Sequence, residues 1–295
     1  MIAVDLGGTK ILAGVVDREG AIGETIELET PDRSEEDVLG AIASLVDRLG
    51  GGAVAVGLGV PCNIDRTTGT CFRATNLPLT DVEFVGPLRE RTGLPVGLVN
   101  DGNAAALAEW RLGAGRGVDD LVMLTLGTGV GGGLVLDGQL YRGWAELGHV
   151  VVQEGGPPCQ GTCHGRGHLE AVASGQAADR RARELYGEGA TAHELVERGR
   201  RGDAEAVGAL ARIGELLGAA IGSFVNMFDP AVVVVGGGFG AAAGDLVLES
   251  ARAAAAREAI QPADTRVRIV EAELGEEAGL IGAALVGFEA LDGRR

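Results

Sequence analysis

The sequence contains very little lysine and few aromatic residues. Lys10 is its single lysine, so arginine supplies nearly all of the positive charge, and the formal net charge is −17. Nucleic acids and anionic membranes are bound through clustered basic residues, and this composition argues against both partners. Because aromatic residues make up only 3% of the chain, the core must be built mainly from valine, leucine, isoleucine and alanine.

Neither a signal peptide nor an uninterrupted membrane-spanning run is expected from this sequence. The start, MIAVDLGG, has no basic region and reaches an aspartate at the fifth residue. The apolar stretch 121–136 contains glycines and ends at Asp137, and Asp229-Pro230 interrupts the stretch 213–244. A membrane span needs about 20 apolar residues in a row, so we expect none here.

Cysteine is scarce too, with four residues in the chain. Cys62 and Cys71 are isolated in the sequence, and a disulfide scaffold is therefore not expected. The default expectation is a cytoplasmic protein with reduced thiols.

Strand-like and helix-like segments alternate along the 295 residues, a length that suggests about two domains. This alternation predicts an α/β protein with largely parallel sheets. The segments 5–20 and 124–138 share one design, in which a Gly/Thr turn joins two apolar strands and an aspartate shortly before a glycine closes the unit. Such a repeat predicts two similar α/β halves. The predicted strands are 2–6, 11–17, 21–29, 53–60, 94–100, a pair within 121–138, 231–237 and 266–272, and the predicted helices are about 35–49, 101–113, 169–184, 203–227, 240–259 and 276–291.

Three glycine-rich turns follow predicted strands: Gly7-Gly8-Thr9, Gly127-Thr128-Gly129 and Gly236-Gly237-Gly238. Glycine lets the backbone approach a phosphate closely, and exposed N–H groups with threonine hydroxyls can bind its oxygens. Each turn taken alone is equally compatible with a simple tight turn. The GxxxxGK[ST] pattern is absent. The GxGxxG-like match at 127–132 opens a strand instead of a helix, which counts against a dinucleotide fingerprint.

Asp101 follows the predicted strand 94–100 and starts a predicted helix. A carboxylate at the carboxyl end of a parallel strand faces the crevice where open α/β sheets bind ligands. The same position also suits a helix N-cap. The residue alone does not decide between a catalytic carboxylate and a cap.

The stretch PPCQGTCHGRGHLE, residues 157–170, holds two of the four cysteines and two of the four histidines. Zinc binds four nitrogen or sulfur ligands tetrahedrally, and structural sites usually take some of them from a tight loop. A Cys159–Cys163 disulfide and scattered surface residues are the alternatives. The candidate zinc ligands are Cys159, Cys163, His168 and the upstream His149, with His164 as a spare.

Six motifs occur in a defined order: DLGGTK at 5–10, NDGNAAALAE at 100–109, LGTGVGGG at 126–133, ELGH at 146–149, C…C…GRGHLEAVASG at 159–175 and DPAVVVVGGG at 229–238. Over essentially the whole chain, this series resembles the ROK family of bacterial sugar kinases. The resemblance implies an α/β protein with the actin-like ATPase (ribonuclease H-like) fold, in which two α/β domains flank a cleft. It implies a small domain of 1–110 plus 279–295, a large domain of 111–278 with the zinc loop, and a homodimer or dimer of dimers.

The resemblance further implies ATP-dependent phosphorylation of the 6-hydroxyl of a hexose, and the closest match is to glucokinases. Asp101 would be the general base that takes the hydroxyl proton, and Asp5 would hold Mg²⁺, through water, beside the phosphates of ATP. The residues implied at ATP are Asp5, Gly7, Gly8, Thr9, Lys10, Gly127, Thr128, Gly129, Gly237 and Gly238. The residues implied at the sugar are Asn76, Asn100, Asp101, Glu146, His149 and Glu170.

Two departures from the family pattern concern the zinc and the sugar. The family's usual CxCGxxGCxE is here a CxxxC spacing with His168 in place of the last cysteine. The implied role of the zinc is structural, fixing His149 and Glu170. Trp144 lies in GWAE, where a Gly/Ala-rich run is expected, so the identity of the sugar substrate is left open. Fructose, mannose, allose, N-acetylmannosamine and N-acetylglucosamine are the alternatives to glucose.

A second class of function within the family is a sugar-sensing regulator lacking its DNA-binding domain. Regulators of this kind carry an added amino-terminal helix-turn-helix domain, whereas DLGGTK begins here at residue 5. A kinase is therefore the leading expectation.

Overall fold

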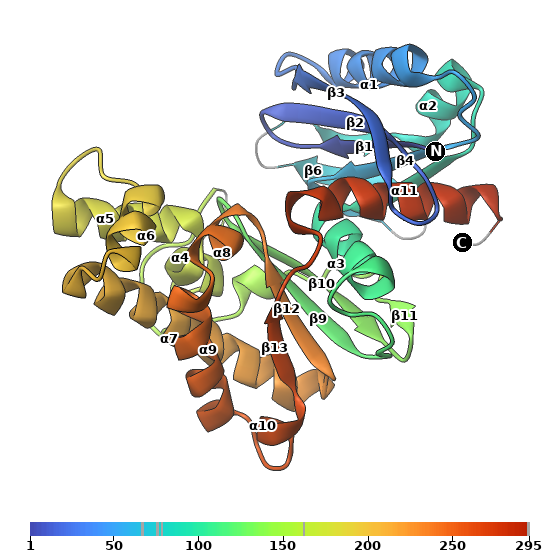
Figure 1. Cartoon of the computed structure of the whole chain (residues 1–295). Coiled ribbons are helices and arrows are strands. Elements are labelled where there is room, and N and C mark those ends of the chain that lie inside the picture. The colour runs from blue at the N-terminus through green and yellow to red at the C-terminus, as the bar shows by residue number, and fades with distance from the viewer. Residues whose placement is uncertain (66–67, 75–76, 78, 162, 294–295) are drawn as a thin grey trace. The chain divides into compact units, whose positions relative to one another are not determined.

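The chain forms two compact units in the computed structural model, which describes residues 1–65, 68–74, 77, 79–161 and 163–293 (Figure 1). Unit 1 consists of Met1–Ala108, Arg142–Trp144 and Glu277–Arg295. Unit 2 consists of Glu109–Tyr141 and Ala145–Glu276. The short segment 142–144 is thus grouped with unit 1, although its neighbours in sequence belong to unit 2.

Unit 1 is built on a five-stranded sheet of order β3-β2-β1-β4-β8. β2 runs antiparallel to both β3 and β1, and β4 and β8 run parallel to β1. The strands are β1 (Ile2–Leu6), β2 (Lys10–Val16), β3 (Ile22–Glu29), β4 (Val56–Val60) and β8 (Val96–Asn100). The helices are α1 (Glu35–Leu49), α2 (Val85–Thr92), α11 (Ala278–Leu291) and α3 (Asp101–Leu112), whose last turn belongs to unit 2.

Local signals in the sequence explain the ends and the packing of these helices. Ser34 caps α1 by accepting a hydrogen bond from the Asp37 backbone N–H, and acidic residues fill the first turn. Helix α11 packs directly onto β4, where a Cβ atom added to Gly57 would lie 1.8 Å from the Ala283 carbonyl oxygen. Glycine is therefore required at this crossing.

A small sheet of order β5-β6-β7 follows β4 in unit 1. Its strands are β5 (Cys62–Ile64), β6 (Thr70–Ala74) and β7 (Thr80–Glu83). Cys62 and Cys71 form a disulfide with a Cα–Cα distance of 5.8 Å. The prediction of unpaired cysteines at these positions is wrong, because the antiparallel β5–β6 pair brings together two residues that are nine apart in the sequence.

Unit 2 repeats the sheet of unit 1. Its strand order is β11-β10-β9-β12-β13, again with two antiparallel pairs followed by two parallel pairs. This confirms the prediction of two similar α/β halves. The strands are β9 (Leu121–Leu126), β10 (Val130–Leu136), β11 (Gln139–Leu140), β12 (Val232–Gly236) and β13 (Arg268–Glu271). The helices are α4 (Leu169–Ala173), α5 (Gly175–Tyr186), α6 (Ala192–Arg200), α7 (Ala204–Phe228), α8 (Gly238–Ala243), α9 (Asp245–Glu258) and α10 (Ala263–Arg266), with short 3₁₀ turns η1 (Leu147–His149) and η2 (Gly275–Glu277).

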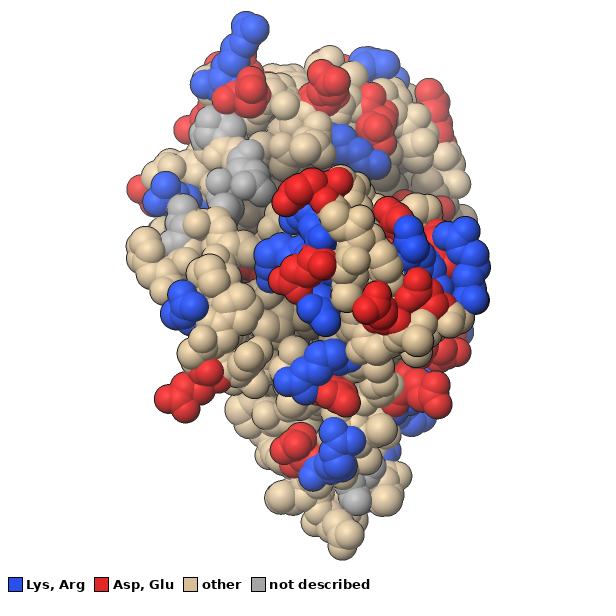
Figure 2. Space-filling model, turned by 90° about the vertical axis from the view of Figure 1, so that its left-hand side faces the viewer, with Lys and Arg blue, Asp and Glu red and all other residues tan. Residues whose placement is uncertain are grey.

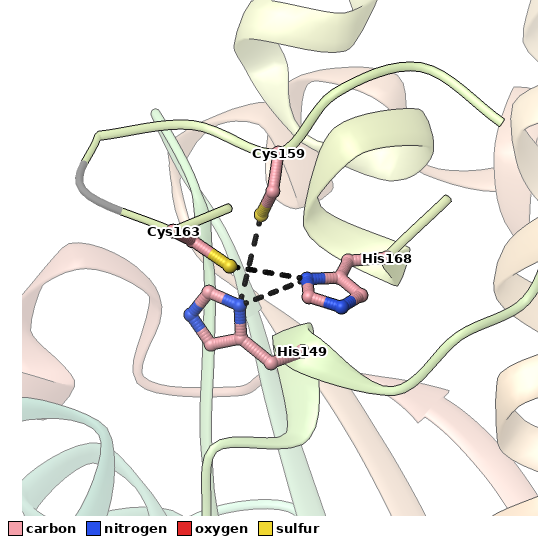
Figure 3. A group of neighbouring side chains, drawn as sticks. All are labelled: His149, Cys159, Cys163 and His168. Atoms are coloured by element: carbon pink, nitrogen blue, oxygen red, sulfur yellow. Dashed lines mark hydrogen bonds between the residues drawn. The ribbon is translucent and has the colours of Figure 1, made fainter. Parts of the chain in front are cut away.

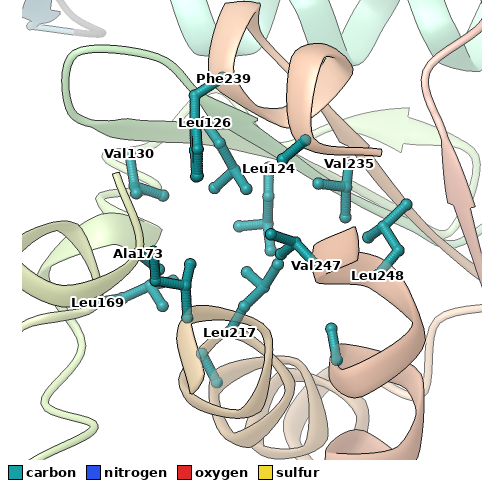
Figure 4. Packing of buried hydrophobic residues seen from close by; sticks show 14 of the residues in the cluster. Leu124, Leu126, Val130, Leu169, Ala173, Leu217, Val235, Phe239, Val247 and Leu248 are labelled. Atoms are coloured by element: carbon teal, nitrogen blue, oxygen red, sulfur yellow. The ribbon is translucent and has the colours of Figure 1, made fainter. Parts of the chain in front are cut away.

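Helices α7 and α9 cover one face of the second sheet and form its core (Figure 4). Leu124 and Val235 of the sheet meet Leu217 of α7 and Val247 of α9. With 25 residues and a mean hydropathy of 1.3 in its most apolar window, α7 is long and apolar enough to cross a membrane. Charged residues such as Arg212 and Glu215 interrupt it, and its burial against the sheet and α9 makes it a core helix.

Arginines on the surface of unit 2 are paired locally. Arg181 with Glu184, Arg200 with Glu197 and Arg212 with Glu215 form ion pairs three residues apart. Figure 2 shows one face of the molecule, on which basic and acidic groups alternate. Among the described residues drawn there, the basic groups form no continuous patch of the kind that binds nucleic acid.

Candidate active site and metal cluster

Asp101 lies at the carboxyl end of β8, where it begins α3. Its Oδ1 accepts hydrogen bonds from the Gly102 N–H (2.8 Å) and from Asn100 Nδ2 (3.0 Å). The helix cap is Asn100, whose Oδ1 accepts from the Asn103 N–H at 3.1 Å. Asn100 Nδ2 also reaches the Cys62 carbonyl oxygen at 3.3 Å. The alternative that Asp101 itself is the cap is therefore wrong, and its exposed carboxylate is held by its neighbours.

Asn103 is a residue near this carboxylate that the sequence did not single out for the site. Its side chain is 6% exposed, and its Oδ1 is a buried acceptor without a partner among the described residues. Leaving such a group unsatisfied costs about 1–3 kcal/mol. A bound water that reaches this buried oxygen would satisfy it.

Asp5, the residue implied at Mg²⁺, lies in β1 beside the glycine turn of residues 7–9. Burial raises the pKa of its carboxyl group, and the charge of Lys10 opposes this shift. Lys10 is exposed and forms an ion pair with Glu27 across β2 and β3 at 3.0 Å. The turn is closed by the Gly7 N–H, which donates to the Lys10 carbonyl oxygen at 2.9 Å. A partly buried carboxylate at the end of a central strand suits a divalent cation, which would offset the cost of its charge.

Gly279 of α11 lies against the Asp5 carboxylate, which occupies the space that a side chain at position 279 would need. A Cβ atom at Gly279 would lie 2.8 Å from Asp5 Oδ2. We expect Gly279→Ala to displace the carboxylate and to raise the Mg²⁺ concentration needed for half-maximal activity, with a loss of about tenfold to 100-fold in kcat/KM for ATP. Gly208→Ala is the matched control, because Gly208 is also helical and nothing lies within 4 Å of its added Cβ. An unchanged Mg²⁺ titration in Gly279→Ala would remove Asp5 from the cation site.

Two further glycine turns lie at the carboxyl ends of neighbouring strands in unit 2. Gly236 at the end of β12 pairs with Thr125 of β9, just before Gly127-Thr128-Gly129. Gly237 has a positive φ of 82°, and a Cβ there would lie 2.6 Å from the Leu126 carbonyl oxygen. The turns at 127–129 and 237–238 are thus side by side, as the implied ATP contacts require.

The four candidate zinc ligands converge in unit 2 (Figure 3). Their ligand atoms all lie within 4.8 Å of one another. His149 Nδ1 is 3.2 Å from His168 Nδ1 and 3.6 Å from Cys159 Sγ, and Cys163 Sγ is 3.6 Å from His168 Nδ1. Cys159 and Cys163 are free thiols, and the spare candidate His164 is exposed and outside the group.

These distances fit a tetrahedral zinc ion. With Zn–N bonds of about 2.0–2.1 Å and Zn–S bonds of about 2.3 Å, tetrahedral ligands are separated by ~3.3 Å for two nitrogens and ~3.6 Å for nitrogen and sulfur. Burial raises the pKa of the Cys159 thiol to about 11, with a smaller contribution in the same direction from Cys163. Because zinc binds the thiolate, its binding here would displace this proton. The cluster can therefore hold a structural zinc ion.

The implied sugar residues of unit 2 surround this cluster. His149 directs Nδ1 toward the cluster, while its Nε2 is 3.9 Å from Glu146 Oε2. Glu170 Oε1 accepts from Cys159 Sγ at 3.7 Å, and its Oε2 accepts from the Val130 N–H at 3.0 Å, directly after the 127–129 turn. Glu170 thus connects the metal cluster to the glycine turn.

The implied site residues fall into groups within each unit. Unit 1 brings Asn100 together with Asp101 and also contains Asp5 with the turn at 7–9, whereas unit 2 brings Glu146, His149 and Glu170 together at the cluster. Asn76, the remaining sugar candidate, lies outside the described residues.

Comparison with known proteins identifies the family. The model of the ROK family matches residues 1–288. The chain belongs to the ROK family. It is 37% identical to a glucokinase of Thermotoga maritima, over 99% of this chain and 98% of that protein. It is 34% identical to an N-acetylmannosamine kinase of Escherichia fergusonii, over 97% of each.

A solved ROK structure gives the same result for the fold. The crystal structure of a ROK family glucokinase from Streptomyces griseus, in complex with glucose and AMPPNP, matches with a TM-score of 0.84 and 35% identity, over 98% of this chain and 99% of that one. The predicted actin-like ATPase fold is therefore confirmed.

Proposed function

We propose that the protein is an ATP-dependent glucose kinase that phosphorylates the 6-hydroxyl group. The observation that carries the proposal is the full-length likeness to a ROK glucokinase solved with glucose and an ATP analogue. The held carboxylate of Asp101, the glycine turns and the metal cluster supply the parts that such a reaction needs.

Asp101 is proposed as the general base. It takes the proton from the 6-hydroxyl, and the sugar oxygen attacks the γ-phosphorus of ATP. The bond from this phosphorus to the bridging β,γ-oxygen then breaks, and ADP leaves. The hydrogen bonds of Asn100 and Gly102 to Oδ1 fix the orientation of the carboxylate, which matters because the base must lie within hydrogen-bond reach of the hydroxyl.

The glycine turns at 7–9, 127–129 and 237–238 are proposed to bind ATP through their backbone N–H groups and the hydroxyls of Thr9 and Thr128. Lys10 adds a positive charge near the first turn. Asp5 would hold Mg²⁺ through water, and the bound ion would neutralise phosphate charge.

Glu146, His149 and Glu170 are proposed to bind ring hydroxyls of the sugar. Zinc bound at His149 Nδ1 would leave Nε2 for a hydroxyl, and the same loop would fix Glu170. Asn76 and Asn100 are the remaining proposed sugar contacts.

N-acetylmannosamine is the second candidate substrate, because a kinase for that sugar is almost as similar to this chain as the Thermotoga glucokinase. ADP release measured over a panel of sugars separates the two. We expect the highest kcat/KM with glucose, and lower values with mannose, fructose, allose, N-acetylmannosamine and N-acetylglucosamine. Turnover with N-acetylmannosamine that exceeds that with glucose would reject glucose as the substrate.

We further propose a cytoplasmic homodimer, on the basis of the family resemblance. A reducing cytoplasm would keep Cys62 and Cys71 as thiols, whereas the structure pairs them, so their redox state tests the compartment. Thiol titration of protein purified without reductant or oxidant, together with its mass in solution, tests both points.

A further inference from the structure

The outer edge of β5 accepts hydrogen bonds from two side chains outside its sheet. Asn100 Nδ2 donates to the Cys62 carbonyl oxygen, and Trp144 Nε1 donates to the Ile64 carbonyl oxygen, each at 3.3 Å. These two carbonyl groups are two residues apart, and the pairing of β5 with β6 shifts its register between them. Asn100 and Trp144 therefore lie along one edge of β5, in the same unit as Asp101.

Trp144 is held firmly and is nevertheless open to solvent. Its ring meets that of Phe72 edge to face, with centroids 5.6 Å apart and an interplanar angle of 78°. Two residues earlier, Arg142 forms an ion pair with Glu289 of α11. Even so, Trp144 is 58% exposed and Phe72 is 37% exposed. This indole is fixed by a hydrogen bond and an aromatic neighbour, and more than half of its surface is uncovered. It is therefore positioned to bind a ligand.

We infer that Trp144 forms a wall of the sugar site, against which the pyranose ring of the substrate packs its C–H groups, and that it contributes to the choice of hexose. This inference rests on the proposed function. Asn100 Nδ2 bonds both Asp101 Oδ1 and the Cys62 carbonyl oxygen, two residues before the carbonyl group that Trp144 bonds. A hexose bound with its 6-hydroxyl at Asp101 therefore lies beside this edge of β5. Its ring then reaches the indole that lies beyond Asn100.

The chemistry of the contact explains the effect on specificity. A pyranose carries C–H groups on its faces and equatorial hydroxyls around its rim, and the negative face of an aromatic ring attracts polarised C–H groups. Glucose has equatorial hydroxyls at its ring carbons 2, 3 and 4. An axial hydroxyl on the packed face would separate the ring from the indole. Trp144 therefore favours glucose over epimers with such a hydroxyl.

Steady-state kinetics of Trp144→Ala and Trp144→Phe provide the first test. We expect Trp144→Ala to raise the KM for glucose about five- to tenfold, with kcat and the KM for ATP within about twofold. The preference for glucose over mannose, allose and galactose should narrow, because at least one of these epimers carries its axial hydroxyl on the packed face. Trp144→Phe should recover most of the affinity. Met227→Ala is the matched control, since Met227 is equally exposed at 58% but lies on α7.

Acrylamide quenching of tryptophan fluorescence provides a test that leaves Trp144 intact. The chain has two tryptophans, and Trp110 is 8% exposed. In Trp110→Phe the emission comes from Trp144 alone. Saturating glucose without nucleotide should reduce the quenching constant at least about twofold, because the sugar covers the exposed ring. If Trp110→Phe folds poorly, the quenching of Trp144 is obtained instead as the difference in quenching between the wild-type protein and Trp144→Phe.

The outcomes separate this inference from the proposed function. An unchanged KM for glucose in Trp144→Ala overturns the inference that Trp144 forms a wall of the sugar site, even if glucose reduces quenching. Unchanged quenching at saturating glucose overturns it as well. Glucose turnover by the wild-type protein in either case leaves the proposed function intact. If the wild-type protein phosphorylates no sugar, the proposed function fails, and the quenching measurement alone decides whether glucose covers Trp144.

Discussion

Asp101→Asn lowers kcat for glucose phosphorylation by about 10²- to 10⁴-fold, the usual contribution of a general base. The amide cannot take the proton of the 6-hydroxyl. Its Oδ1 can still accept from Asn100 Nδ2 and the Gly102 N–H, which now hold the carboxylate. The dissociation constant for glucose, measured by calorimetry, should therefore stay within about threefold of the wild-type value.

The design of this experiment must allow for the neighbouring glycine. An asparagine before Gly102 deamidates readily, which would regenerate aspartate and mimic residual activity. Asp101→Ala cannot revert and is measured alongside, with mass spectrometry of the asparagine variant before and after the assay. Near-normal turnover by Asp101→Ala with a native melting temperature would show that another group is the base.

Cys163→Ser is expected to remove zinc and to weaken sugar binding. The wild-type protein should contain about one zinc per chain, and the variant much less, because serine is a poor ligand for this ion. Loss of the metal frees His149 and the loop that carries Glu170, so the KM for glucose should rise about 10- to 100-fold. The KM for ATP should change less.

His164→Ala is the matched control for this prediction. His164 lies in the same loop, next to Cys163, but is exposed and outside the cluster. Its zinc content and KM should equal those of the wild type. Wild-type protein that lacks zinc after purification in metal-replete medium, yet binds glucose fully, would contradict the cluster's assignment. A zinc loss in His164→Ala equal to that in Cys163→Ser would contradict the choice of His168 as a ligand.

The central strands and the repeat of the sheet could be predicted because their signals are local. Runs such as 2–6 and 231–237 are apolar and end in glycine turns, and the likeness of segments 5–20 and 124–138 corresponds to the same strand order in both sheets. The small sheet β5-β6-β7 was missed, because its short strands depend on pairing and on a disulfide. The residues of these three strands show no alternating apolar pattern from which the strands could be predicted.

Helix boundaries were less predictable than the strands, although some signals were present. The single helix predicted at 169–184 is two helices, since Ser174 caps α5 by accepting from the Ala177 N–H. The helix predicted at 240–259 is interrupted at Gly244, which has a φ of 48°. Helix α6 was missed, yet Thr191 and Glu194 carry the spacing of a capping box at its start.

The metal cluster was predictable in composition, whereas the environment of Trp144 was not. Spacing and resemblance proposed His149, Cys159, Cys163 and His168, and these are the residues that converge. By contrast, Phe72 and Ile64 are far from Trp144 in the sequence and meet it only in the fold. The same holds for the bond from Asn100 to Cys62.

The central claim is phosphoryl transfer from ATP to the 6-hydroxyl of glucose. The most direct test is ³¹P and ¹H NMR of the products formed from glucose, ATP and Mg²⁺, with 6-deoxyglucose in a parallel reaction. The account predicts ADP and glucose 6-phosphate from glucose, and no sugar phosphate from 6-deoxyglucose. Absence of any glucose phosphate, or a phosphate on a hydroxyl other than that of carbon 6, would contradict it.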